Sequence, residues 1–341
     1  MLKRDLTHMD LLRAVGISLV VLRHSFSPFR NSWDVSKYYQ YSPMADFIGR
    51  YISTISMPLF VFISGYIYYY LRNNLGKYSS YKILLNKKSR RLIVPYLILA
   101  PIYIYFFLDY TSITSFLAHL WTGSGHLWFL LMMFLMFLIY YKFETFLCNH
   151  YIISMVIGLF LYFLIIPTSF FDLQPITKLC KYFVFFQMGN LFNKYSLTIL
   201  SYLKNKVLLI YFMHLTLFGI YFYLYQTIEN KYIMVIVKQI NLVLSILALC
   251  FVYGFLNVII TRYPSFVSKL KPSIRFINYN SYYIYLIHQP ILKVFFTFIF
   301  VQHMQISSAI ILAFIVSMSF SILLGSLLMK QKLGRALIGS N

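Results

Sequence analysis

Residues 9–24 read MDLLRAVGISLVVLRH, a mostly apolar stretch about as long as a helix that spans a membrane. The stretch nevertheless carries ionisable side chains at Asp10, Arg13, Arg23 and His24. Ionisable groups are costly in hydrocarbon and normally face a polar cavity or one another. At about 100° per residue, Asp10, Arg13 and His24 fall on one face of a helix, and Arg23 is turned off it.

Eleven residues separate Arg13 from His24, which is about 16 Å along a helix axis. This spacing suggests one long ligand that is held at the cation and reacts at the imidazole. Alternatively, Arg13 snorkels to the membrane edge and His24 is bonded to a neighbouring helix. Asp10 lies one turn below Arg13 and could either orient its guanidinium or merely neutralise it.

The composition excludes an ordinary soluble protein. Of the 341 residues, 60% are hydrophobic and 20% aromatic, and only 11% are charged. We therefore expect one integral-membrane domain over residues 1–341, with no separate soluble domain.

The three cysteines show no ligand spacing, so we predict neither a disulfide framework nor a metal site. The net charge of +22 could suggest nucleic acid, but the basic residues lie between apolar runs, and we expect no nucleic-acid partner.

Apolar runs of sufficient length predict an all-α membrane bundle of about ten helices, two of them weak. Most of the 30 Lys and Arg residues lie in segments that face the cytoplasm if the N-terminus does, so we expect both termini there. The predicted spans are residues 10–28, 46–71, 92–109, 126–143, 151–167, 179–194, 207–228, 233–260, 278–300 and 306–329.

Several short motifs occur in a fixed order along the chain. They are DLLRA at 10–14 with His24 beyond it, MPLFVFISGY at 57–66, KSRRLIVPY at 88–96, HLWFL at 126–130 and NSYYIYLIHQP at 280–290. In this order and spacing they resemble the acyltransferase-3 family of integral membrane acyltransferases over nearly the whole chain. The stretch FFQMGN at 185–190 fits more loosely.

The resemblance implies transfer of an acyl group, usually acetyl from cytoplasmic acetyl-CoA, to a sugar hydroxyl of a surface glycan or its lipid-linked precursor. It makes His24 the leading catalytic candidate. An imidazole can act near neutral pH as a general base or as a transient acyl carrier, and the sequence leaves both open. No bound cofactor is expected beyond the acyl-CoA cosubstrate. We expect a multi-pass protein of a cell membrane, in contact with lipid and most simply the bacterial cytoplasmic membrane. The oligomeric state is left open.

A basic cluster precedes the third predicted span. By the resemblance, Arg90 and Arg91 bind the phosphates of CoA, and Lys88 beside them is a further candidate for substrate binding. Arg13 of the first span suits an anionic part of the donor, because a guanidinium stays charged and binds phosphate in a bidentate manner. The family often has arginine where this chain has lysine, so Arg90 and Arg91 are the closest matches. An ordinary run of cytoplasmic positive charge would look the same. Pro95 suits a kinked helix start that could turn these groups toward the bundle.

Three further side chains are candidates for substrate binding. His126 and Trp128 open the fourth predicted span at its outer end, where Trp128 is either an interfacial anchor or a platform for a sugar ring. His288 lies within a predicted span before Pro290 and is either a ligand-binding group or a satisfied buried histidine. Gly65 follows Ser64 and is expected to permit close helix packing rather than to mark a nucleophile.

Two other classes of function compete with an acyltransferase. A transporter or flippase for a glycan or small solute would use Arg13 and His24 as binding and relay groups. A transporter would be more convincing if each half of the chain had a corresponding helix interrupted by Gly or Pro. The prolines of this chain do not form such a pair. A structural subunit of a polysaccharide synthase complex is the third reading.

Overall fold

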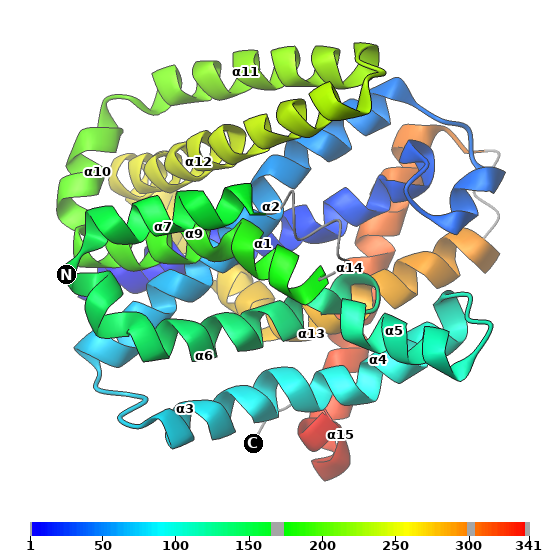
Figure 1. Ribbon diagram of the computed structural model, residues 1–341, viewed down its shortest axis with the longest axis horizontal. Coiled ribbons are helices and arrows are strands. Elements are labelled where there is room, and N and C mark those ends of the chain that lie inside the picture. The colour runs from blue at the N-terminus through cyan, green and yellow to red at the C-terminus, as the bar shows by residue number, and fades with distance from the viewer. Residues whose placement is uncertain (1, 165–173, 299–303, 338–341) are drawn as a thin grey trace. The chain divides into compact units, whose positions relative to one another are not determined.

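The computed structural model describes residues 2–164, 174–298 and 304–337, and all regular structure within these ranges is helical (Figure 1). The predicted all-α class is therefore confirmed. The chain forms two compact units, which are described separately below. The first consists of Met1–Ile63 and Tyr195–Ile322, and the second of Ser64–Lys194 and Leu323–Asn341.

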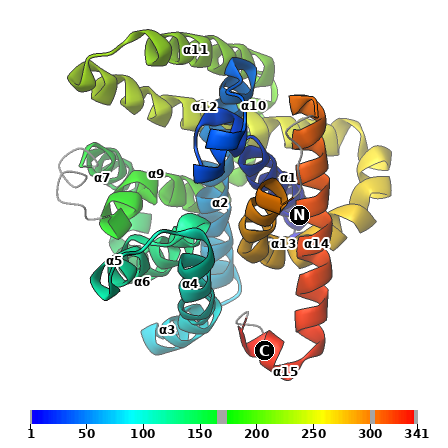
Figure 2. The same ribbon diagram turned by 90° about the vertical axis from the view of Figure 1, so that its right-hand side faces the viewer.

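In the first unit, α13 packs along α1 and α11 packs along α12 (Figures 1 and 2). A side-chain cap at Asn230 starts α12, because its Oδ1 accepts from the backbone N–H groups of Tyr232 and Ile233. The unit contains α1 (Leu2–Ser25), the short 3-10 helices η1 (Ser27–Arg30) and η2 (Asp34–Tyr38), most of α2 (Pro43–Tyr69), α10 (Ser196–Lys204), α11 (Val207–Thr227), α12 (Lys231–Arg262), α13 (Pro264–Phe298) and most of α14 (Ile306–Lys330).

In the second unit, α6 and α7 both pack against α9. Gly65 at the end of α2 lies so close to α9 that a Cβ there would collide with the carbonyl oxygen of Phe186, which confirms its predicted role in close packing. The unit contains the π turn η3 (Tyr70–Asn74), α3 (Tyr81–Lys88), the π turn η4 (Ser89–Ile93), α4 (Val94–Phe107), α5 (Ile113–Thr122), η5 (Gly125–Leu127), α6 (Trp128–Asn149), α7 (Tyr151–Phe163), α9 (Gln174–Lys194) and α15 (Lys332–Leu337).

Pro95 follows a locally widened turn and does not break the helix, and Arg90 and Arg91 stay exposed rather than turned into the bundle. The π turn η4 comes directly before Val94 and Pro95, so the helical path from Tyr81 to Phe107 is continuous but locally widened. This widened turn carries the basic residues Arg90 and Arg91.

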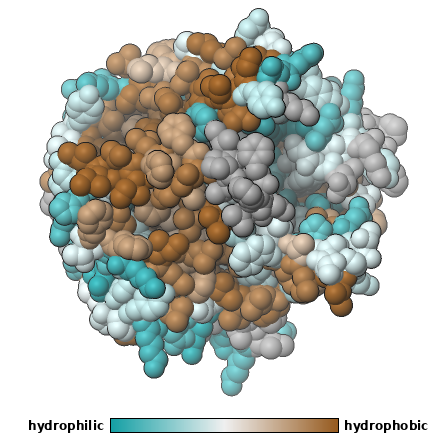
Figure 3. Space-filling view, in the orientation of Figure 1, coloured by the Kyte–Doolittle hydropathy of each residue, from teal (hydrophilic) through white to brown (hydrophobic). Residues whose placement is uncertain are grey.

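Each of the ten predicted spans overlaps a helix, although residues 165–167 and 299–300 lie outside the described part of the chain. Hydrophobic residues cover much of the face drawn in Figure 3, as expected for helices that contact lipid. Within the described ranges, six helical stretches are long and apolar enough to cross a membrane: Pro43–Asn74, Tyr81–Phe107, Gly125–Asn149, Val207–Thr227, Tyr232–Arg262 and Ile306–Lys330.

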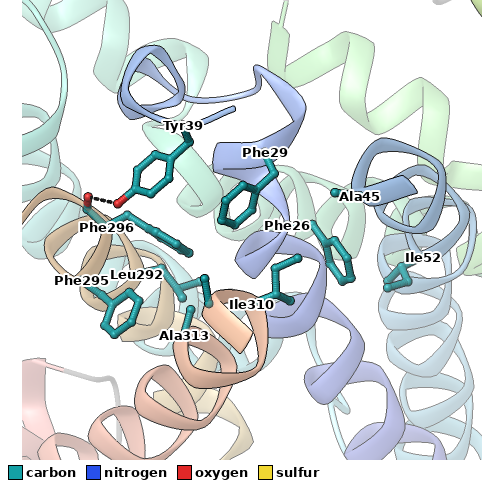
Figure 4. Packing of buried hydrophobic residues seen from close by; sticks show 11 residues of the cluster. Phe26, Phe29, Tyr39, Ala45, Ile52, Leu292, Phe295, Phe296, Ile310 and Ala313 are labelled. Atoms are coloured by element: carbon teal, nitrogen blue, oxygen red, sulfur yellow. Dashed lines mark hydrogen bonds between the residues drawn. The ribbon is translucent and has the colours of Figure 1, made fainter. Parts of the chain in front are cut away.

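A buried apolar cluster fixes the segment that follows α1 (Figure 4). Phe29 and Tyr39 of this segment pack edge-on against Phe296 of α13, with ring centroids 5.9 and 5.5 Å away. The hydroxyl of Tyr39 also donates a hydrogen bond of 2.7 Å to the carbonyl oxygen of Phe296, shown as the dashed line in Figure 4. The segment between α1 and α2 is therefore anchored to α13.

Candidate active site

The lower part of α1 is held against α13 by polar contacts around Arg13. The side-chain amide of Asn278 donates to the carbonyl oxygen of Asp10 at 2.8 Å. Arg13 Nη2 lies 3.5 Å from Ser281 Oγ, at the long end of hydrogen-bond distances. The guanidinium of Arg13 therefore faces α13, and the orienting role of Asp10 stays a prediction.

His24, near the end of α1, meets a second imidazole from α13. The ring centroids of His24 and His288 are 5.2 Å apart, with a 45° angle between the ring planes. His24 is half-buried, whereas His288 has no exposed surface. Two histidines separated by more than 260 residues along the chain are thus brought together in one unit.

The ring orientation of His288 is fixed by its own helix. Its Nδ1–H donates to the carbonyl oxygens of Ile284 at 2.9 Å and Tyr285 at 2.8 Å. The carbonyl oxygen of His288 in turn accepts a hydrogen bond of 3.1 Å from Ser317 Oγ on α14. Both the side chain and the backbone of His288 are therefore held in place.

Trp33 is a neighbour of His24 that sequence reasoning missed. Its ring is nearly parallel to the His24 imidazole, with a 19° interplanar angle and a centroid distance of 5.9 Å. Trp33 lies at the N-terminal end of η2 and packs against the apolar cluster of Figure 4. An aromatic residue close after the first span was the available signal, but its contact with His24 depends on how the loop folds.

Arg23 points to a different element from the residues above. Its Nε donates a 2.7 Å hydrogen bond to Ser53 Oγ on α2, and Ser53 donates in turn to the carbonyl oxygen of Gly49. The predicted separation of Arg23 from the face that bears Arg13 and His24 is therefore confirmed.

Three of the predicted donor-binding cations, Lys88, Arg90 and Arg91, lie in the second unit, whereas Arg13 lies in the first. Arg90 and Arg91 are exposed on the π turn η4. Lys88 is half-buried, and its Nζ lies 3.4 Å from the ring centroid of Phe137 and 5.3 Å from that of Tyr78. These aromatic faces stabilise the ammonium group by cation–π attraction.

His126 and Trp128 lie next to each other in the same unit. His126 is buried in η5, edge-on to Tyr103 at a centroid distance of 5.8 Å. The indole of Trp128 stacks on Tyr182 of α9 at 5.6 Å, and Lys178 Nζ lies 5.3 Å from the indole ring. Trp128 is thus packed within the unit, and its binding role stays a prediction.

The first unit therefore contains His24, His288, Arg13 and Asp10, and the second contains Lys88, Arg90, Arg91, His126 and Trp128. Within the described residues, no group of three or more His, Cys, Asp or Glu side chains could hold a metal ion.

Apolar helices, an imidazole pair and a guanidinium on the same helix as one imidazole define a helical membrane protein with groups suited to acid–base or acyl-transfer chemistry. The family model described as an acyltransferase domain matches residues 6–329, so the chain belongs to the acyltransferase-3 family and is a membrane acyltransferase. The resemblance found in the motifs is confirmed. No curated protein and no solved structure matches the chain.

Proposed function

We propose that this protein is an O-acyltransferase that moves an acyl group, most simply acetyl, from cytoplasmic acyl-CoA to a sugar hydroxyl. The acceptor is a surface polysaccharide or its lipid-linked precursor. The observation that carries the proposal is His24, a half-buried imidazole that contacts a second imidazole and shares its helix with Arg13.

His24 supplies the chemistry as a general base. It removes the proton of the acceptor hydroxyl while the oxygen attacks the thioester carbonyl carbon, so a C–O bond forms and the C–S bond breaks. The proton then passes to the departing thiolate, which leaves an ester and the free thiol of CoA. In the covalent variant the imidazole itself carries the acyl group between donor and acceptor.

The remaining candidates divide between the two substrates. Arg13, oriented by Asp10, and the cations Lys88, Arg90 and Arg91 bind the phosphates of the donor, because guanidinium groups match phosphate geometry. His126 and Trp128 contact the acceptor, and Trp33 beside His24 offers a further aromatic face for a sugar ring.

The proposal includes a topology of ten spans with both termini in the cytoplasm, in a cell membrane of bacterial type. The donor then arrives from the cytoplasm at the basic residues, and the acceptor arrives from the outer side near His24. Support comes from the distribution of Lys and Arg along the sequence.

The test is release of CoA by the purified protein in lipid nanodiscs. The donor is acetyl-CoA, and the acceptors are octyl glycosides of a hexose, an N-acetylhexosamine and a 6-deoxyhexose. Free thiol and acetylated glycoside are measured together. Loss of a general base typically costs about 10²- to 10⁴-fold, so we expect His24→Ala to lower turnover by at least about 10²-fold.

His214 provides the matched control, because it is also a buried histidine of the first unit and is bonded to Thr54 rather than placed beside His24. His214→Gln should keep wild-type turnover per folded protein. Near-normal turnover in His24→Ala would refute the assignment. Movement of the glycosides across vesicle membranes without any release of CoA would favour a flippase instead.

A further inference from the structure

The hydrogen bonds of His288 determine which of its nitrogens carries the proton. Carbonyl oxygens only accept, so Nδ1, which lies 2.9 and 2.8 Å from the oxygens of Ile284 and Tyr285, must be the donor. In the neutral ring the lone pair is then on Nε2. His288 is therefore fixed as a hydrogen-bond acceptor at Nε2.

The environment of His288 makes this arrangement stiff. The side chain is fully buried, and Ser317 of α14 holds the backbone carbonyl of the same residue at 3.1 Å. Backbone carbonyls that accept from one nitrogen of an imidazole also raise the basicity of the other nitrogen. Nε2 of His288 is thus a preoriented acceptor.

His24 is the neighbouring side chain that can donate a hydrogen bond to Nε2 of His288. A centroid separation of 5.2 Å and a 45° tilt make the two rings direct neighbours. An N–H of His24 that donates to Nε2 leaves its other nitrogen with the lone pair. The same bond stabilises the imidazolium that forms when His24 takes a proton, as the third member of a catalytic triad does.

We propose that His288 is a positioning residue: its Nε2 sets the tautomer of His24 and stabilises the protonated form of that ring during acyl transfer. This inference rests on the proposed acyltransferase function. It assigns His288 to the reaction step, whereas the sequence suggests either a substrate-binding group or a satisfied buried histidine.

Amide side chains offer a sharp test, because Gln places its amide near the position of Nε2 and Asn places it near Nδ1. In the acetyl-CoA and octyl glycoside assay, His288→Asn and His288→Phe should lower kcat by about 10- to 100-fold, as is typical when a group that orients an imidazole is lost. KM for acetyl-CoA and for the glycoside should stay unchanged. His288→Gln should recover most of the lost kcat.

The controls separate this role from a structural one. His214→Phe removes another fully buried imidazole of the same unit and should leave kcat per folded protein unchanged, with thermal unfolding in nanodiscs as the measure of folding. Equal kcat in His288→Asn, His288→Gln and the wild type would overturn the proposal. A rise in KM at constant kcat would also overturn it and would make His288 a binding residue.

A second measurement uses the wild-type protein, so it does not depend on folding of the Asn or Phe variants. In ¹⁵N-histidine-labelled protein, the ring signals that vanish in His288→Gln should be those of the tautomer protonated at Nδ1. A tautomer protonated at Nε2 would contradict the inference. If the wild-type protein releases no CoA, or if His24→Ala releases CoA as fast as the wild type does, the proposed function itself is refuted.

Discussion

Arg13 combines a permanent charge with a position on the same helix as His24. A hydrogen bond to a charged group is worth about 1.5–3 kcal/mol, and a loss of that size corresponds to about 10- to 100-fold in affinity. We therefore expect Arg13→Gln to raise KM for acetyl-CoA by about that factor with little change in kcat, measured by CoA release.

Arg23 supplies the comparison, because it lies on the same helix but donates to Ser53 on α2. Arg23→Gln should leave KM for acetyl-CoA unchanged. If Arg13→Gln has the wild-type KM, or if both variants raise it equally, Arg13 has no specific role in donor binding.

Local sequence was enough to single out Arg13 and His24 as candidates, because helical spacing within one segment fixes their separation. The same reasoning could not show that His288 contacts His24, since that contact joins segments more than 260 residues apart. Trp33 was missed for a related reason. Its stacking on His24 depends on short 3-10 turns anchored through Tyr39, and hydropathy does not report such turns.

Close packing of α2 against α9 depends on Gly65. A methyl group there would collide with the carbonyl oxygen of Phe186, a backbone atom that cannot easily move aside. We expect Gly65→Ala to destabilise the protein by about 1–3 kcal/mol, as overpacking does. Thermal unfolding in nanodiscs measures the effect.

Gly219 of α11 gives the matched control, because a Cβ there meets nothing within 4 Å. Gly219→Ala should be neutral or stabilise by up to about 1 kcal/mol, since alanine favours a helix over glycine. Equal effects of the two substitutions would mean that Gly65 is not needed for the packing of α2 on α9.

Tyr39 ties the segment after α1 to α13, and its burial raises the pKa of its hydroxyl above the ordinary value of 10.0. The folded protein then keeps this proton at pH values where the unfolded chain loses it. The resulting stability is fully present below the unfolded pKa and is lost as the pH rises through the folded pKa.

Comparison of the wild type with Tyr39→Phe separates the contribution of Tyr39 to stability from the contributions of the other tyrosines. At neutral pH the variant should be less stable by about 1 kcal/mol, the value of one hydrogen bond. The difference in Tm between wild type and variant should shrink as the pH rises above about 10. A difference that stays constant with pH would show that Tyr39 does not titrate with unfolding.

The long helices were predictable because a sustained apolar run has few alternatives in a membrane. The short helices α5 (Ile113–Thr122) and α10 (Ser196–Lys204) were not predictable in this way, because neither is long enough to span a membrane. The first part of α13, Pro264 onward, was missed for another reason. It bears Lys269, Lys271 and Arg275, so it is polar although it is continuous with the apolar part of the helix.

The charge distribution over the whole chain determines the expected topology, and with it the side on which each substrate arrives. Lys77, between α2 and α3, should face the cytoplasm, and Thr111, between α4 and α5, should face outward; both side chains are exposed. In a background where Cys148, Cys180 and Cys250 are replaced by serine, each position is changed to cysteine. A membrane-impermeant maleimide should label Thr111→Cys in intact cells and Lys77→Cys only after permeabilisation.

A fluorescent protein fused to the C-terminus tests the even number of spans independently, because it matures in the cytoplasm and should therefore fluoresce. Labelling of Lys77→Cys in intact cells would put the basic residues Arg90 and Arg91 on the outer side, away from the cytoplasmic pool of acyl-CoA. A cytoplasmic donor could then not reach the cations assigned to it. The reaction proposed for His24 would need either a donor from outside or a different chemistry.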